Sequence, residues 1–258
     1  MVFALVSASL AISLFLGMLL FLEIGRRLGV RRAAERGPAA KAGVGVVDGA
    51  VYGLLALLIG FMFSGAAERF DRRRQIVAQQ ENAASTAWLR VDALPPDQQA
   101  AIRAGFRRYM DELIAYYAEH ASSQVLLEAP PGLTTAERDL WRAAIAACKT
   151  PGGEPARMLL LPALNEMFDA VDMERMARRI HPPLVIYVML GIAALATALF
   201  AGYGMASGPT RNTIYMIGIA ATISIATYVI IELEYPRVGL FRVSSMDQVL
   251  VQLRASME

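Results

Sequence analysis

The sequence predicts an all-α integral membrane protein: four transmembrane helices, with a helical extramembrane domain between the second and third. Apolar residues make up 56 % of the 258 positions and charged residues only 19 %, and the mean hydropathy is +0.42. These values are too apolar for an ordinary soluble domain. No segment shows the period-two alternation of a half-buried strand. The apolar residues instead gather into long runs, which predict membrane-spanning helices.

Four segments each hold about 20 apolar or small residues, enough to cross a hydrocarbon core of about 30 Å. They are residues 2–22, 44–67, 182–206 and 213–233. Their Gly, Ala, Ser and Thr residues suit close helix packing in lipid. The first segment has no basic residues before its apolar run, which favours a retained helix over a cleaved signal peptide.

The predicted organisation has four parts. Residues 1–67 hold the first two spans and a basic connecting loop, and 68–181 form the helical domain, continuous with the second span. Residues 182–233 hold the last two spans, and 234–258 are a C-terminal tail.

Local signals define the helices of the extramembrane domain. The segment after Pro95 repeats apolar residues at helical spacing: Ile102, Phe106, Tyr109, Leu113 and Tyr116 or Tyr117. Thr134 and Glu137 form a capping-box pattern that predicts a helix start. "TPGGEP" predicts a break, and Pro162 predicts a kink in the last helix before the third span.

The second span continues into the charged segment "AERFDRRR" without a Pro or a loop residue. Residues 44–91 are therefore predicted to form one helix of about 48 residues, about 70 Å long. One face, which we name the second-helix stripe, is small or apolar at membrane depth, then charged, then uncharged and polar. Its residues are Gly53, Leu57, Phe61, Ser64, Glu68, Arg72, Gln75, Gln79, Asn82 and Thr86. The opposite face keeps Phe70, Val77, Ala84, Trp88 and Val91 for burial.

Such a change of polarity along one face suits a pore, with an apolar constriction that gates by dewetting and a wet vestibule beyond it. The alternative is a packing helix whose polar face meets bulk water.

Two stretches resemble bestrophins. "GFMFSGAAERFDRRRQIVAQQENAASTAWLRVDAL" resembles the second helix of bestrophins, and "IELEYPRVGLFRV" is similar to the segment in which an acidic run precedes Asn-Pro-Phe-Gly. Over nearly its whole length the chain looks like the bestrophin-like domain family of unknown function. The shared features are the four-span layout, the Arg-rich first loop, "FSGAAERFDRRR" and a terminal motif formed by Pro236, Gly239, Arg242 and Val243.

Bestrophins are homopentameric anion channels in eukaryotes, and some bacterial members favour cations. Their second helices line the pore, and three apolar residues one turn apart form its neck. The resemblance places neck positions at Gly53, Leu57 and Phe61, with Ser64 and Glu68 further along the pore. The vestibule residues would be Arg72, Gln75, Gln79 and Asn82. Because Gly53 departs from the bulky residue expected there, a constriction depends on Leu57 and Phe61.

The resemblance also bears on regulation. The acid-rich calcium clasp of animal bestrophins is missing, since "RVGLFRVSSMDQ" holds one acid, so calcium gating is not expected. The alternative function is a non-conducting membrane scaffold or sensor that binds partners through the helical domain. That function predicts a second-helix stripe buried against helices of the same subunit.

The expected partners are the lipid bilayer, further copies of the chain in a homo-oligomer (a pentamer by resemblance) and small inorganic ions. A net charge of +2 gives no nucleic-acid signal. The resemblance places the protein in a bacterial inner membrane with its helical domain in the cytoplasm. The arginines of the first loop favour the opposite orientation by the positive-inside rule.

Several acidic residues lie at or within the predicted span ends. Asp48 is either a functional residue within the span or an interfacial acid. Glu68 either contributes to a charged ring at the pore exit or pairs with Arg72 at i,i+4. Glu232 and Glu234 are expected to interact with arginines at the same level, Arg237 or Arg69.

The sequence carries no signature of an enzyme. It has no Gly-rich phosphate loop, HExxH, CxxC or Ser-Gly elbow. The spans lack the paired acids or the Ser-His pair of an intramembrane protease. One cysteine (Cys148) and two histidines (His120 and His181) do not make a metal cluster. We therefore expect no enzymatic activity, cofactor or metal.

Overall fold

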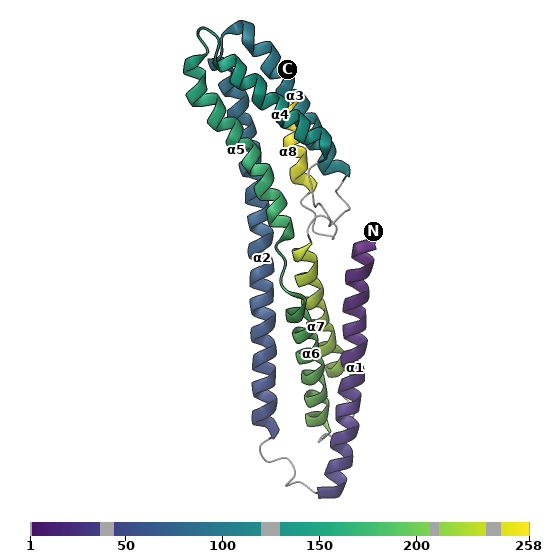
Figure 1. The fold of residues 1–258 in the computed structure, drawn as a ribbon. Helices are drawn as coiled ribbons and strands as arrows, with labels where there is room; N and C mark the ends of the chain where they lie inside the picture. Colours follow the sequence, from purple (N-terminus) through teal and green to yellow (C-terminus); the bar gives the residue numbers. More distant parts are fainter. Residues whose placement is uncertain (1, 37–43, 120–129, 207–211, 236–243, 258) are drawn as a thin grey trace. The chain divides into compact units, whose positions relative to one another are not determined.

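A computed structural model describes residues 2–36, 44–119, 130–206, 212–235 and 244–257. Every regular element in these ranges is helical, which confirms the predicted all-α class (Figure 1). Four stretches of the described chain are helices long and apolar enough to cross a membrane. The helices are α1 (Val2–Arg36), α2 (Val44–Arg90), α3 (Pro96–Glu119), α4 (Pro131–Cys148), α5 (Glu154–Arg179), α6 (Leu184–Met205), α7 (Thr213–Glu234) and α8 (Ser244–Ala255), with a 3₁₀ turn at Val91–Ala93.

The chain divides into two compact units. The membrane unit comprises residues 1–69 and 182–235, and the helical unit comprises residues 70–181 and 236–258. In the membrane unit α1, α6 and α7 lie side by side (Figure 1). Its largest core cluster includes Met18, Leu22, Leu55, Leu190 and Ala198.

Glycine allows α1 and α6 to pack with their backbones in contact. A Cβ atom at Gly25 would collide with the main chain of Leu199, and one at Gly202 would collide with the main chain of Leu22. Gly25 and Gly29 form a Gly-x-x-x-Gly pair on α1, the pattern that allows close approach of helices in lipid. The helix α1 runs on to Arg36, past the predicted end at Leu22, and Glu23 pairs with Arg26 and Arg27 one turn ahead.

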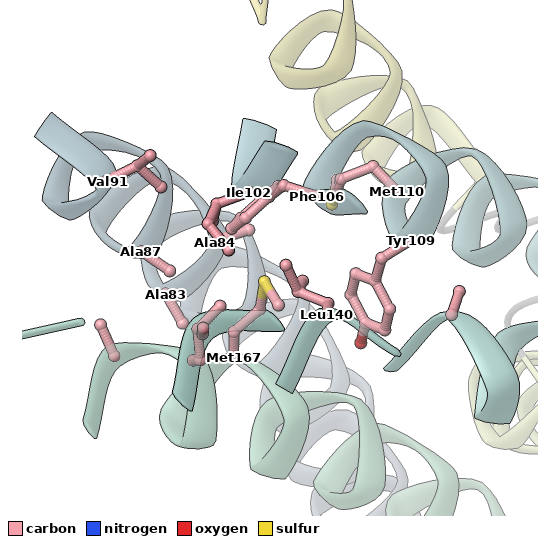
Figure 2. Close-up of a cluster of buried hydrophobic side chains, with 14 of the residues drawn as sticks. Ala83, Ala84, Ala87, Val91, Ile102, Phe106, Tyr109, Met110, Leu140 and Met167 are labelled. Carbon is pink, nitrogen blue, oxygen red and sulfur yellow. The ribbon is translucent and has the colours of Figure 1, made fainter. Parts of the chain in front are cut away.

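The helical unit has one apolar core (Figure 2). The α3 residues predicted for burial from their helical spacing are all buried. They meet Ala83, Ala84 and Ala87 of α2, Leu140 of α4 and Met167 of α5. Trp88 packs edge-on against Phe106, with ring centroids 5.5 Å apart.

Proline decides where α4 begins, and here the capping-box prediction is wrong. The helix begins at Pro131, after the extended residue Pro130. Proline at the first helical position has a suitable φ and needs no donor. Thr134 therefore lies inside the helix, where its hydroxyl donates to the carbonyl of Pro130 at 3.3 Å.

The break at "TPGGEP" is confirmed, with Gly152 at φ +82°, a conformation that glycine adopts without strain. Pro162 lies within α5. The tail contains α8, for which the sequence analysis predicted no helix. It packs on α3 through buried Leu250 and through an ion pair between Arg254 and Asp111, with Nε–Oδ1 at 2.8 Å.

Candidate pore-lining face and buried carboxylates

The helix α2 continues from the membrane unit into the helical unit as one element of 47 residues. It ends at Arg90 and is followed by the 3₁₀ turn, after which Leu94, before Pro95, takes an extended conformation. Its absence of proline and its good helix formers explain why the helix persists through the charged segment. This helix carries the whole second-helix stripe.

The chain leaves the stripe uncovered. Leu57 is 53 % exposed and Phe61 is 68 % exposed. A Cβ atom at Gly53 would meet no atom within 4 Å. The remaining stripe residues are exposed as well, except Thr86, which is half-buried: Ser64, Glu68, Arg72, Gln75, Gln79 and Asn82. No ion pair joins Glu68 to Arg72 in the described part of the chain, so the predicted i,i+4 pair does not form.

The opposite side of α2 packs against the rest of its own chain. Leu55, Met62 and Ala66 are buried in the membrane unit. In the helical unit the predicted burial of Val77, Ala84 and Val91 is confirmed, while Phe70 and Trp88 are half-buried. The two faces of α2 therefore differ as the period of 3.6 residues predicts.

A buried ion pair fixes α2 to α7. Glu234 is fully buried, and the Arg69 guanidinium donates to it from Nε at 3.0 Å to Oε1 and 2.9 Å to Oε2. This confirms one of the two arginine partners expected for the acids at the end of the fourth span. Gly65 leaves room for the arginine, since a Cβ atom there would lie 3.1 Å from Arg69 Nη1. Because Arg69 immediately follows Glu68, the two side chains lie on different faces of α2.

Glu232 joins α7 to α1. It is fully buried, and the Ser7 hydroxyl donates to its Oε1 at 2.6 Å. Ser7 was not predicted as a partner, because a single serine in an apolar span ordinarily satisfies itself on its own helix. In the sequence, the only indication that Glu232 has a partner is its position at the end of the fourth span.

A second polar cluster lies in the helical unit. Gln80 is buried, and its Nε2 donates to the Tyr117 hydroxyl at 2.8 Å. The Arg178 guanidinium lies 5.2 Å from the Tyr117 ring centroid and pairs with Glu174, with Nε–Oε1 at 2.5 Å. These contacts tie α2, α3 and α5 together behind the exposed glutamines of the stripe.

The structure places some of the other singled-out residues and leaves others outside its described ranges. Asp48 is buried, with 9 % of its surface exposed. Pro236, Gly239 and Arg242 of the terminal motif lie outside the described residues, as do Arg237 and His120. Within the described ranges no group of three or more His, Cys, Asp or Glu is placed to hold a metal ion.

Comparison with known proteins decides the family. The family model of the bestrophin-like domain matches residues 11–247. The chain belongs to the bestrophin-like family. Comparison with curated proteins gave no match.

Solved structures show the same fold. One is the crystal structure of a bacterial bestrophin homolog from Klebsiella pneumoniae with a tyrosine-to-alanine mutation. It has a TM-score of 0.72 and 12 % identity, over 93 % of this chain and 97 % of that chain. A tryptophan-to-alanine variant of the Klebsiella pneumoniae homolog has a TM-score of 0.67 and 14 % identity, over 96 % of this chain and 97 % of that chain. This bestrophin-like membrane protein therefore has the bestrophin-homolog fold.

Proposed function

We propose that this bestrophin-like protein is the subunit of an oligomeric ion channel whose pore is lined by α2. The observation that carries the proposal is the exposure of the second-helix stripe. Its apolar part at membrane depth and its polar part beyond have no cover from their own chain. A scaffold that packed this face against its own helices would bury it. The exposure of the stripe supports a pore in which the stripe contacts water and the stripes of other copies of the chain.

Leu57 and Phe61 are proposed as the neck. Both are large, apolar and exposed on the same side of α2, and a ring of such side chains closes a narrow pore by excluding water. Gly53 adds no side chain to the ring. Ser64 and Glu68 continue the pore beyond the neck.

Arg72, Gln75, Gln79 and Asn82 are proposed to line the vestibule. Their exposed side chains alternate with the buried positions that anchor α2 in the helical unit. The buried Arg69–Glu234 pair at the start of this region holds α2 at a fixed rotation. With α2 at that rotation, Glu68 and Arg72 lie on the exposed second-helix stripe.

Cysteine labelling tests the vestibule. A cysteine at Gln79 should react with a small, water-soluble thiol reagent. It should react at least about tenfold more slowly with a polymer-linked reagent, because a pore restricts large molecules while admitting small ones. Cysteines at exposed Arg74, on another side of α2, and at buried Ala84 provide the matched controls. Equal labelling of Gln79 and Arg74 by both reagents, or a purified protein that stays monomeric, would overturn the channel proposal.

A further inference from the structure

The membrane unit contains a cavity that the channel proposal does not use. It has a volume of about 510 Å³ and lies among α2, α6 and α7. Small-molecule sites have volumes of about 300–1,000 Å³ and are mostly apolar with a few polar groups. Most of the lining residues here are aliphatic, such as Leu55, Ile59 and Ile219. The exceptions include Tyr52, Thr197 and Tyr215.

Two buried polar side chains near this cavity each have an oxygen atom without a hydrogen-bond partner among the described residues. Thr197 lines it and is 5 % exposed, and its hydroxyl makes no hydrogen bond within the described residues. Asp48 is 9 % exposed, and its Oδ1 likewise has no partner there. The other carboxylate oxygen of Asp48 lies 3.7 Å from the Cβ position of Gly204, which lines the cavity. A buried carboxylate oxygen without a partner is costly, so this group favours a positively charged ligand.

The residues around Asp48 indicate which type of cation would bind there. Tyr52 lies one turn along α2 from Asp48, and Tyr52 and Tyr215 both line the cavity. Tyrosine rings attract organic cations through their faces. A divalent metal ion needs several oxygen ligands, but none of the described lining residues is acidic, and Asp48 lies beside the cavity as a single carboxylate. One carboxylate, two phenol rings and an apolar cavity instead match an ammonium group that carries an apolar chain.

We propose that this cavity binds an amphipathic amine. The ammonium group lies at Asp48 between Tyr52 and Tyr215, and the apolar chain fills the space among α2, α6 and α7. Asp48 and Tyr52 lie near the N-terminal end of α2, Tyr215 near the N-terminal end of α7 and Gly204 near the C-terminal end of α6, while Thr197 and Ile59 lie further from these ends. This arrangement gives the ligand one orientation. The site does not depend on ion conduction.

Thermal unfolding of the purified protein in dodecyl maltoside tests the proposal. The probes are nonylamine, nonan-1-ol and nonanoate, which share one chain length and differ in head group. Nonylamine should raise the unfolding temperature saturably at pH 7, and more than the alcohol or the acid does. Asp48→Asn should weaken the effect of nonylamine by about tenfold or more, since a charged hydrogen bond is worth about 1.5–3 kcal/mol. This variant should fold, because it removes an uncompensated buried charge.

Ala201→Leu is the second variant. Ala201 lines the cavity, so the larger side chain should weaken binding of the amine and the alcohol alike. Equal effects of amine and alcohol on the wild type would overturn the proposal, and so would an amine effect that Asp48→Asn leaves unchanged. Either result would show apolar partitioning without recognition of the head group.

Native mass spectrometry distinguishes the source of the amine. Retention of phosphatidylethanolamine over phosphatidylglycerol with the same acyl chains, lost in Asp48→Asn, would support the proposal and identify a membrane lipid as the ligand. Stabilisation by nonylamine without this lipid preference would support the proposal with a free amphipathic amine. Failure of both probes would overturn it.

Discussion

At the scale of single residues, the Arg69–Glu234 pair determines which way α2 faces. Glu234 is fully buried and Arg69 is its partner from α2. Removing one member of a buried pair leaves the other charge uncompensated, which costs about 3–5 kcal/mol. Arg69→Met should therefore lower the unfolding temperature strongly.

Two further variants separate this effect from loss of a surface charge. Arg69→Met combined with Glu234→Gln should recover much of the lost stability, because no buried charge remains. Arg74→Met removes an exposed partner of Asp71, 3.8 Å away, and should cost less than about 1 kcal/mol. Equal losses for Arg69→Met and Arg74→Met would contradict the assigned role.

The Gln80–Tyr117 hydrogen bond makes a second prediction. Tyr117→Phe removes the acceptor of the buried Gln80 amide. Leaving a buried donor unsatisfied costs about 1–3 kcal/mol. Denaturation monitored by circular dichroism should show that loss, whereas Gln79→Leu on the exposed neighbour should change stability little. A Tyr117→Phe variant as stable as the wild type would show that the bond contributes nothing.

The cysteine gives a pH dependence. Burial raises the pKa of the Cys148 thiol, so the native state holds this proton to higher pH than the unfolded chain does. The free energy of unfolding should therefore fall as the pH rises past the unfolded thiol value, about 8.5. Alkylation by iodoacetamide at pH 8.5 should be at least about tenfold slower in native than in denatured protein. Equal rates would contradict the buried thiol.

At the scale of helices, the α1–α6 contact depends on glycine. Gly202→Leu would force a side chain into the main chain of α1, whereas Gly191 of the same helix has no atom within 4 Å of its Cβ position. Overpacking typically costs about 1–3 kcal/mol. Gly202→Leu should therefore lower the unfolding temperature and Gly191→Leu should not. Similar effects of the two substitutions would contradict a backbone contact at Gly202.

The helices also show what periodicity can and cannot predict. The two faces of α2 follow from spacing alone, because burial repeats with the helix period. The start of α4 does not follow from spacing. Thr134 and Pro131 are both residue types that begin helices, and only the structure shows that the helix begins at Pro131. The extension of α1 through its arginines was not predicted. The length of an apolar segment shows where a membrane span ends, but the helix itself can continue beyond that point.

The candidate site was predictable to a similar degree. The stripe was predicted from its helical spacing, and Arg69 was one of the two arginines expected near Glu232 and Glu234. The Ser7–Glu232 hydrogen bond and the buried Asp48 depend on which helices pack together. Packing of helices distant in sequence leaves no signal in local composition. Those contacts therefore required the structure.

At the scale of the whole molecule, the proposed channel gives the exposed stripe a role. In a single chain the apolar part of this face would contact lipid and the charged part would contact water. Copies that surround a shared axis would give the face a continuous water-filled surface with one apolar constriction. The proposed arrangement would explain why one helix continues from the membrane unit into the helical unit. It would also explain why the other face of that helix carries the anchoring residues.

Ion flux from liposomes containing the purified, inserted protein tests this account most directly. Phe61→Ala and Leu57→Ala should each raise the flux several-fold or change its selectivity, because they shorten the side chains of the proposed neck. Phe63→Ala is the matched control, since Phe63 is also exposed on α2 but lies off the stripe, and it should conduct like the wild type. An absence of flux for every ion tested, in all four proteins, would contradict the channel and favour a scaffold.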